Sequence, residues 1–63
     1  MKTNIRVKLT GTDGNVFSII AKVSGTLKKE GEKELAAEFR AAAFSCGSYD
    51  EVLRLCMSYV EVE

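Results

Sequence analysis

The sequence predicts an α+β fold with the element order β-α-α-α-β, in which three helices pack on one face of a two-stranded sheet. Two observations lead to this prediction. Apolar and polar residues alternate near both ends of the chain, whereas apolar residues recur every three or four positions through the middle. Because the chain has 63 residues, we expect one domain over residues 1–63.

The first strand is predicted over residues 4–10, NIRVKLT. Three apolar residues alternate there with three polar ones: Ile5, Val7 and Leu9 with Arg6, Lys8 and Thr10. Such alternation is typical of a strand with one buried face. The chain ends in YVEVE, which predicts a short second strand. We expect the basic residues of the first strand to lie beside Glu61 and Glu63, because opposite charges stabilise neighbouring strands. Parallel and antiparallel pairing both fit this pattern.

The first helix is predicted over residues 15–29, after a turn at GTDGN. Asp13 or Asn15 is its expected N-cap, and Gly14 lies in the turn before it. Gly31 is placed to end the helix in a left-handed conformation. GTDGN matches neither glycine-rich phosphate-binding pattern, so we expect a turn and no phosphate site.

Gly25 lies inside the first helix. An interior glycine weakens a helix, and we expect this one to permit close packing.

The second helix is predicted over residues 32–46, where alanine dominates, with Gly47 ending it. Ser48 and Glu51 have the spacing of a capping box and open a third helix. This helix is apolar on nearly all sides, so we expect its own fold or a neighbouring molecule to cover it.

Several classes of function are disfavoured. The chain has no histidine, the usual general base near neutral pH, so we expect no enzyme, no catalytic residue, no cofactor and no metal site. No uninterrupted apolar run exceeds four residues, so we expect no membrane span. Cys46 and Cys56 lie within apolar patterns and are expected to be buried thiols in a reducing cytoplasm.

The charge is unevenly distributed along the chain. Residues 1–29 hold six basic residues and one acidic residue, and residues 30–63 hold three basic and eight acidic ones. The basic half suggests an alternative function, an accessory nucleic-acid-binding protein with a basic face from residues 2–29. We do not expect nucleic acid as the main partner, because Phe17 and Phe39 fall in apolar stripes and no exposed aromatic accompanies the lysines.

Self-association is the leading functional expectation. A chain this short buries little apolar surface, and a two-stranded sheet has two open edges. We therefore expect a small interaction module that forms a homodimer through a strand edge or through the third helix, with an unidentified protein as another possible partner. The candidate contact residues are Arg6, Lys8, Met57, Tyr59 and Glu61.

The opening GTDGNVFSII and the ending SYDEVLRLCMSYVEVE resemble a family of small uncharacterised bacterial and phage proteins that have a GxDGN opening and a YDxxLR…VEV ending. The resemblance covers nearly the whole chain. It implies a cytoplasmic context linked to mobile elements and carries over no catalytic residue. The matching positions are Asp13, Gly14, Asn15, Tyr49 and Asp50.

Overall fold

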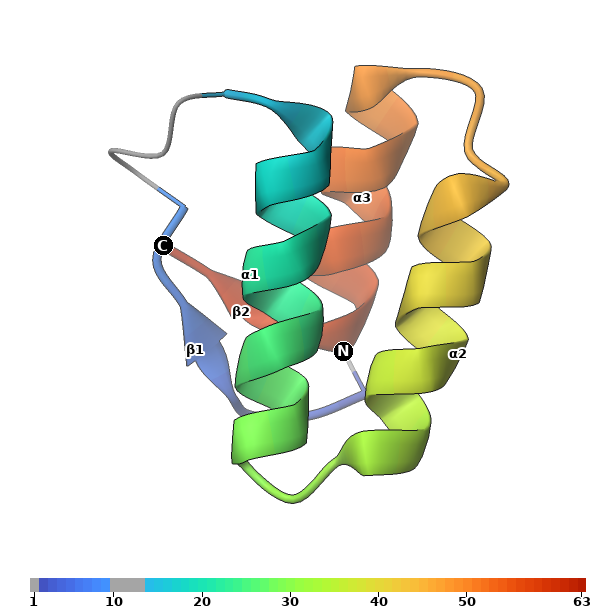
Figure 1. Cartoon of the computed structure of the whole chain (residues 1–63). Coiled ribbons are helices and arrows are strands. Elements are labelled where there is room, and N and C mark those ends of the chain that lie inside the picture. The colour runs from blue at the N-terminus through green and yellow to red at the C-terminus, as the bar shows by residue number, and fades with distance from the viewer. Residues whose placement is uncertain (1, 10–13) are drawn as a thin grey trace.

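The computed structural model describes residues 2–9 and 14–63. Within these residues it contains two strands and three helices, which confirms the predicted class and element order (Figure 1). The elements are β1 (Arg6–Val7), α1 (Val16–Lys29), α2 (Lys33–Phe44), α3 (Tyr49–Tyr59) and β2 (Glu61–Val62).

The two strands pair in parallel, with Arg6 opposite Glu61 and Val7 opposite Val62. Backbone hydrogen bonds continue beyond them: the Lys2 N–H donates to the Ser58 carbonyl (2.9 Å) and the Leu9 N–H to the Glu63 carbonyl (2.9 Å). Residues 2–9 therefore run along residues 58–63. Parallel strands need a long crossover connection, and here the three helices provide it.

The predicted charge pairing across the strands is confirmed for Arg6. Its Nε lies 3.3 Å from Glu61 Oε2 and 3.7 Å from Glu63 Oε1. Val7 is buried on the inner face, while Arg6 and Lys8 are exposed, as the alternation predicts.

The helices run up and down beside one another, and the strand pair contacts α1 and α3 (Figure 1). The α2 helix packs on the other two helices, on the side away from the strands. Phe39 is the largest fully buried side chain, and its ring meets the Tyr59 ring edge to face with 5.4 Å between centroids. The other buried apolar residues are Val7, Ile19, Ile20, Val23, Leu27, Ala36, Ala43, Val52, Cys56 and Val60.

The molecule is as compact as an ordinary monomer of its mass. Its accessible surface is 4075 Å², close to the roughly 4000 Å² that the size scaling of monomeric proteins gives for 6.9 kDa. Hydrophobic side chains that remain exposed are therefore not the result of loose packing.

The predicted helix starts are confirmed where the structure describes them. Asn15 is the N-cap of α1, since its side-chain oxygen accepts from the Phe17 N–H at 2.8 Å. Asp13, the other candidate, lies outside the described residues. Gly14 precedes the cap with φ +78°, a left-handed conformation that suits glycine.

Ser48 caps α3 by accepting from the Glu51 N–H at 3.2 Å. The Glu51 carboxylate accepts from the Gly47 N–H at 3.1 Å, so the return bond of the capping box reaches one residue further back than the standard pattern.

The two predicted glycine stops have different outcomes. Gly31 has φ +86° and follows α1 as predicted; the Glu32 N–H donates to the Leu27 carbonyl at 2.8 Å in a Schellman arrangement. The prediction that Gly47 ends α2 is wrong, because the helix ends at Phe44. Ser45 stops it earlier: its N–H turns to the Ala42 carbonyl (3.1 Å) and its hydroxyl donates to the Ala41 carbonyl (3.2 Å).

Gly25 does not permit close packing within the chain, contrary to the prediction. A Cβ at this position would meet no other atom of the described residues within 4 Å, and φ lies outside the left-handed region. We therefore expect Gly25→Ala to raise the free energy of unfolding by about 0.5–1 kcal/mol, because alanine loses less backbone entropy in a helix. Urea denaturation followed by circular dichroism measures this change.

Gly31→Ala is the matched control for Gly25→Ala. It should lower stability by about 1 kcal/mol or more, because a side chain at φ +86° is strained. Equal effects of the two substitutions would contradict this account of α1.

Candidate interaction surface

Three exposed aromatic side chains gather at one end of the helical layer. Phe17 is 63% exposed, Phe44 58% and Tyr49 45%. They come from the start of α1, the end of α2 and the start of α3, which lie together at the top of Figure 1. The Phe17 and Phe44 ring centroids are 6.1 Å apart. We call these three residues the aromatic patch.

The exposure of Phe17 corrects the sequence analysis, which placed it in the apolar stripe of the first helix. Ile19, Ile20 and Val23 fill the core side of α1, so Phe17 falls beyond the buried stripe and points outward. An exposed aromatic residue therefore does occur within residues 2–29.

A hollow of about 580 Å³ lies beneath the aromatic patch. All three patch residues line it, together with apolar side chains such as Val16 and Val52. Among the described residues, none with a charged side chain borders it. We call it the uncharged hollow.

A second hollow, of about 590 Å³, runs between α1 and α2. Phe17 and Phe44 border this one as well, but three cations also line it: Lys28, Lys33 and Arg40. We call it the cationic groove. The Phe17–Phe44 pair thus borders both hollows.

The predicted contact residues lie at different places. Met57 is 54% exposed on α3, away from the aromatic patch, and Lys8 is exposed beside β1. Arg6 and Glu61 are exposed but are joined to each other by an ion pair. The structure therefore does not bring these residues together as one site.

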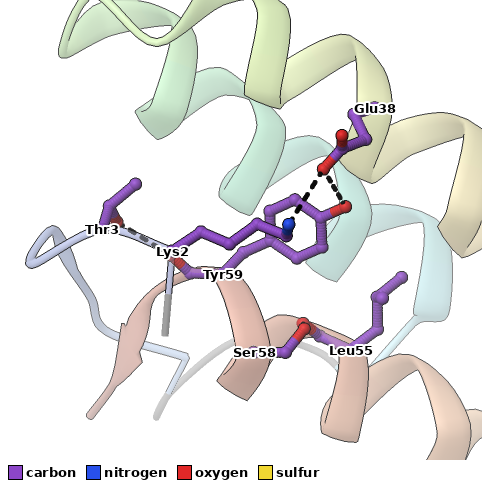
Figure 2. A network of polar contacts seen from close by, with 6 residues as sticks. All are labelled: Lys2, Thr3, Glu38, Leu55, Ser58 and Tyr59. Carbon is purple, nitrogen blue, oxygen red and sulfur yellow. Dashed lines mark hydrogen bonds and ion pairs between the residues drawn. The ribbon is translucent and has the colours of Figure 1, made fainter.

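Tyr59 is a core residue, which corrects its prediction as a contact residue. It is only 4% exposed, and Figure 2 shows its hydroxyl directed at Glu38 on α2, to which it donates a 2.5 Å hydrogen bond. The Lys2 Nζ lies 3.7 Å from the same carboxylate oxygen and 5.4 Å from the Tyr59 ring centroid. Thr3 donates to the Tyr59 carbonyl at 2.8 Å.

The network around Tyr59 shifts the pKa of two of its groups. Burial, then the hydrogen bond and the negative charge of Glu38, raise the pKa of Tyr59 to about 12. The Tyr59 hydrogen bond holds the pKa of Glu38 below its ordinary value against the opposing effect of burial, and the nearby charge of Lys2 lowers it further. Separately, burial raises the pKa of Cys56 to about 11. These contacts are structural: they tie the first residues of the chain to α2 and α3.

The described residues provide no grouping of three or more histidine, cysteine, aspartate or glutamate side chains that would suit a metal ion. Cys46 and Cys56 are unbridged, with Cys56 buried as expected and Cys46 half-buried. Over residues 2–9 and 14–63, no helix combines the length and apolarity needed to cross a bilayer.

In comparisons with protein-family models, curated proteins and solved structures, no match to this chain was found. The resemblance to small bacterial and phage proteins therefore stays a prediction.

The pKa of Tyr59 leads to a prediction for alkaline pH. A group whose pKa is raised on folding stabilises the fold fully below its unfolded pKa, here 10, and this contribution is lost as the pH rises through the folded value of about 12. Because Tyr59 donates a hydrogen bond to Glu38 that phenylalanine cannot make, wild type should be more stable than Tyr59→Phe at neutral pH, and the raised pKa of Tyr59 means that the difference should shrink between pH 10 and 12. Urea unfolding at several pH values measures it.

Both proteins keep Cys56, so its own loss of stability at alkaline pH cancels in the comparison. Tyr49→Phe is the control, because the Tyr49 ring is exposed, and its pH profile should follow that of wild type. A wild-type advantage over Tyr59→Phe that stays constant to pH 12 would refute the assignment.

Proposed function

We propose that this protein is a small, non-enzymatic interaction module that forms a homodimer through the aromatic patch. The observation that carries the proposal is the gathering of Phe17, Phe44 and Tyr49 around the uncharged hollow. Exposed apolar groups that gather in this way on a compact monomer are typical of protein interaction sites. Aromatic residues are also enriched at such interfaces.

The lack of charge around this hollow favours a second copy as the partner. A two-fold axis places the same surface of both subunits face to face. Since none of the described residues lining the hollow is charged, no like charges of the lining itself are brought together. The uncharged hollow of each subunit would then be filled by aromatic rings of the other subunit.

The strand edges are less suited to symmetric pairing. Two β1 edges related by a two-fold axis would bring the basic side chains of Arg6 and Lys8 near their own copies, and two β2 edges would do the same with Glu61 and Glu63. Like charges directly opposite destabilise paired strands. Of the two modes of self-association expected from the sequence, the strand edge is therefore disfavoured, and the third helix contributes Tyr49 to the aromatic patch alongside residues of α1 and α2.

The size of the molecule sets the expected strength of the dimer. A standard interface buries about 800 Å² per partner, roughly a fifth of the 4075 Å² exposed here. The aromatic patch occupies one end of the molecule only. We therefore propose a weak dimer that exchanges with the monomer.

The alternative function, nucleic-acid binding by the basic face of residues 2–29, has one observation in its favour: Phe17 is exposed, and Lys28 lines the same groove about three helical turns away. Two observations weigh against it. Lys2 pairs with Glu38, and Arg6 pairs with Glu61, so part of that basic face is neutralised within the chain. Self-association is thus the better supported function.

A cytoplasmic location and the link to mobile elements belong to this proposal as well. Unbridged Cys46 and Cys56 support a reducing compartment, because disulfides persist mainly in oxidising ones. The link to mobile elements rests on the sequence resemblance alone.

Sedimentation equilibrium from about 10 µM to about 1 mM tests the dimer, because this range brackets weak protein interfaces. Wild type should pass from monomer toward dimer mass across it. Phe17→Gln and Tyr49→Ser should each weaken dimerisation about 5- to 30-fold, the range expected for truncating an aromatic anchor.

Met57→Gln is the matched control, since Met57 is similarly exposed but lies away from the patch on α3. Its dimer should match that of wild type. A wild-type protein that stays monomeric throughout, or a Met57 variant as defective as the Phe17 variant, would refute the proposal. Binding of short DNA or RNA by the monomer would instead favour the alternative.

A further inference from the structure

The cationic groove differs from the uncharged hollow in its charge. Lys28 lies in the last turn of α1, Lys33 begins α2 and Arg40 follows two turns later, and all three line the groove. Among the described residues, none that lines the groove is acidic, and no ion pair is recorded for these three cations. Three other cations of the chain do have acidic partners: Lys2, Arg6 and Arg54. The groove therefore presents unneutralised positive charge.

The floor of the cationic groove, between the cations and the aromatic rings, is formed mainly by residues with small side chains. Ala21 and Gly25 come from α1, and Ala36 and Ala37 come from α2. The lining on α1 extends from Phe17 to Lys28, which is about 16 Å at 1.5 Å per helical residue, or three turns. Aromatic rings lie at one end of this length and two lysines at the other.

We propose that the cationic groove binds an acidic amphipathic helix of a partner protein. The apolar face of that helix would lie on the small residues of the floor and against Phe17 and Phe44, and its carboxylates would pair with Lys28, Lys33 and Arg40. Helices that lay an apolar face into a groove are a recurring mode of recognition, and complementary charge fixes the partner and the register. This inference does not depend on self-association through the uncharged hollow.

A second copy of this chain is not the expected occupant. A two-fold axis through the groove would bring the three cations of each subunit into one interface, in which none of the described lining residues is acidic. Like charges brought together in this way oppose association. Charge complementarity therefore selects a different, acidic partner.

Nucleic acid fits the groove less well than an acidic helix. The Phe17 and Phe44 rings lie at one end of the groove and two lysines at the other, so aromatic and basic residues do not alternate along it as a base-stacking site requires. The floor between the cations consists of small side chains, which suit the close approach of a helix. Three cations also neutralise few phosphates, whereas phosphate contacts supply most of the affinity for nucleic acid.

Gly25 gives independent support for a closely packed partner. It is exposed inside α1, where glycine weakens the helix, and no atom of residues 2–9 or 14–63 lies within 4 Å of the Cβ position, where it would exclude a side chain. A partner helix lying on the floor of the groove would explain the glycine, because a side chain at position 25 would keep that helix from packing closely on α1.

A synthetic helical peptide provides the test. One peptide carries leucines along one face and glutamates beside them, and a matched peptide has lysines in place of the glutamates. Fluorescence anisotropy at low salt should show the acidic peptide binding with a Kd below about 100 µM, and binding should weaken as salt rises. The basic peptide should not bind. A short single-stranded DNA and a short RNA that carry the same fluorescent label as the peptides are titrated in parallel.

Charge reversal locates the site. Lys28→Glu and Arg40→Glu should each weaken binding of the acidic peptide about tenfold or more, because close charge pairs across an interface are lost. Lys22→Glu is the matched control on α1: Lys22 is exposed but does not line the groove, so its effect should stay below about threefold. Gly25→Leu should also weaken binding, since its side chain would occupy the floor.

The outcomes separate this inference from the proposed dimer. Tyr49 borders the uncharged hollow and not the cationic groove, so Tyr49→Ser should bind the acidic peptide as wild type does. Failure of the acidic peptide to bind, equal effects of Lys28→Glu and Lys22→Glu, or tighter binding of an oligonucleotide than of the peptide would overturn the inference. None of these results would bear on the dimer.

Discussion

Parallel pairing of the first residues of the chain with the last is the constraint on which the rest of the structure depends. Residues 2–9 bond to residues 58–63, and a parallel pair requires a crossover that the three helices supply. Tyr59 holds the first residues of the chain against the last ones and against the core, because its carbonyl accepts from Thr3 while its ring packs on Phe39. The inner faces of all three helices are thereby committed to one core.

This closure separates the residues that hold the fold from those that remain available for contact. The two oppositely charged halves of the chain meet within the molecule, at Arg6 with Glu61 and at Lys2 with Glu38. Two surfaces remain available: the uncharged aromatic patch at the end where α1 begins, α2 ends and α3 begins, and the cationic groove between α1 and α2. One surface thus suits a copy of itself and the other suits an acidic partner.

Local sequence features predicted most of the fold, and long-range geometry decided the rest. The helix starts at Asn15 and Ser48 depend on hydrogen bonds over a few residues, so they could be read from the sequence. Parallel pairing could not, because the charge pattern fits either direction. The exposure of Phe17 and the burial of Tyr59 depend on how each helix is rotated against the core, and apolar spacing defines that rotation only to within a neighbouring position. The cationic groove is formed by residues of two helices, α1 and α2, and the sequence pattern of either helix alone does not predict it.

The central claim is that the exposed aromatic residues serve contact with another molecule and not the stability of the fold. Amide chemical shifts of ¹⁵N-labelled protein, followed by NMR during dilution of the protein alone, test it most directly. We expect the chemical-shift changes to be concentrated in residues 14–20 and 43–52, around the aromatic patch, and the shifts of the strand residues to stay unchanged. Changes centred on the strand edges or on the exposed face of α3, or no change on dilution, would contradict it.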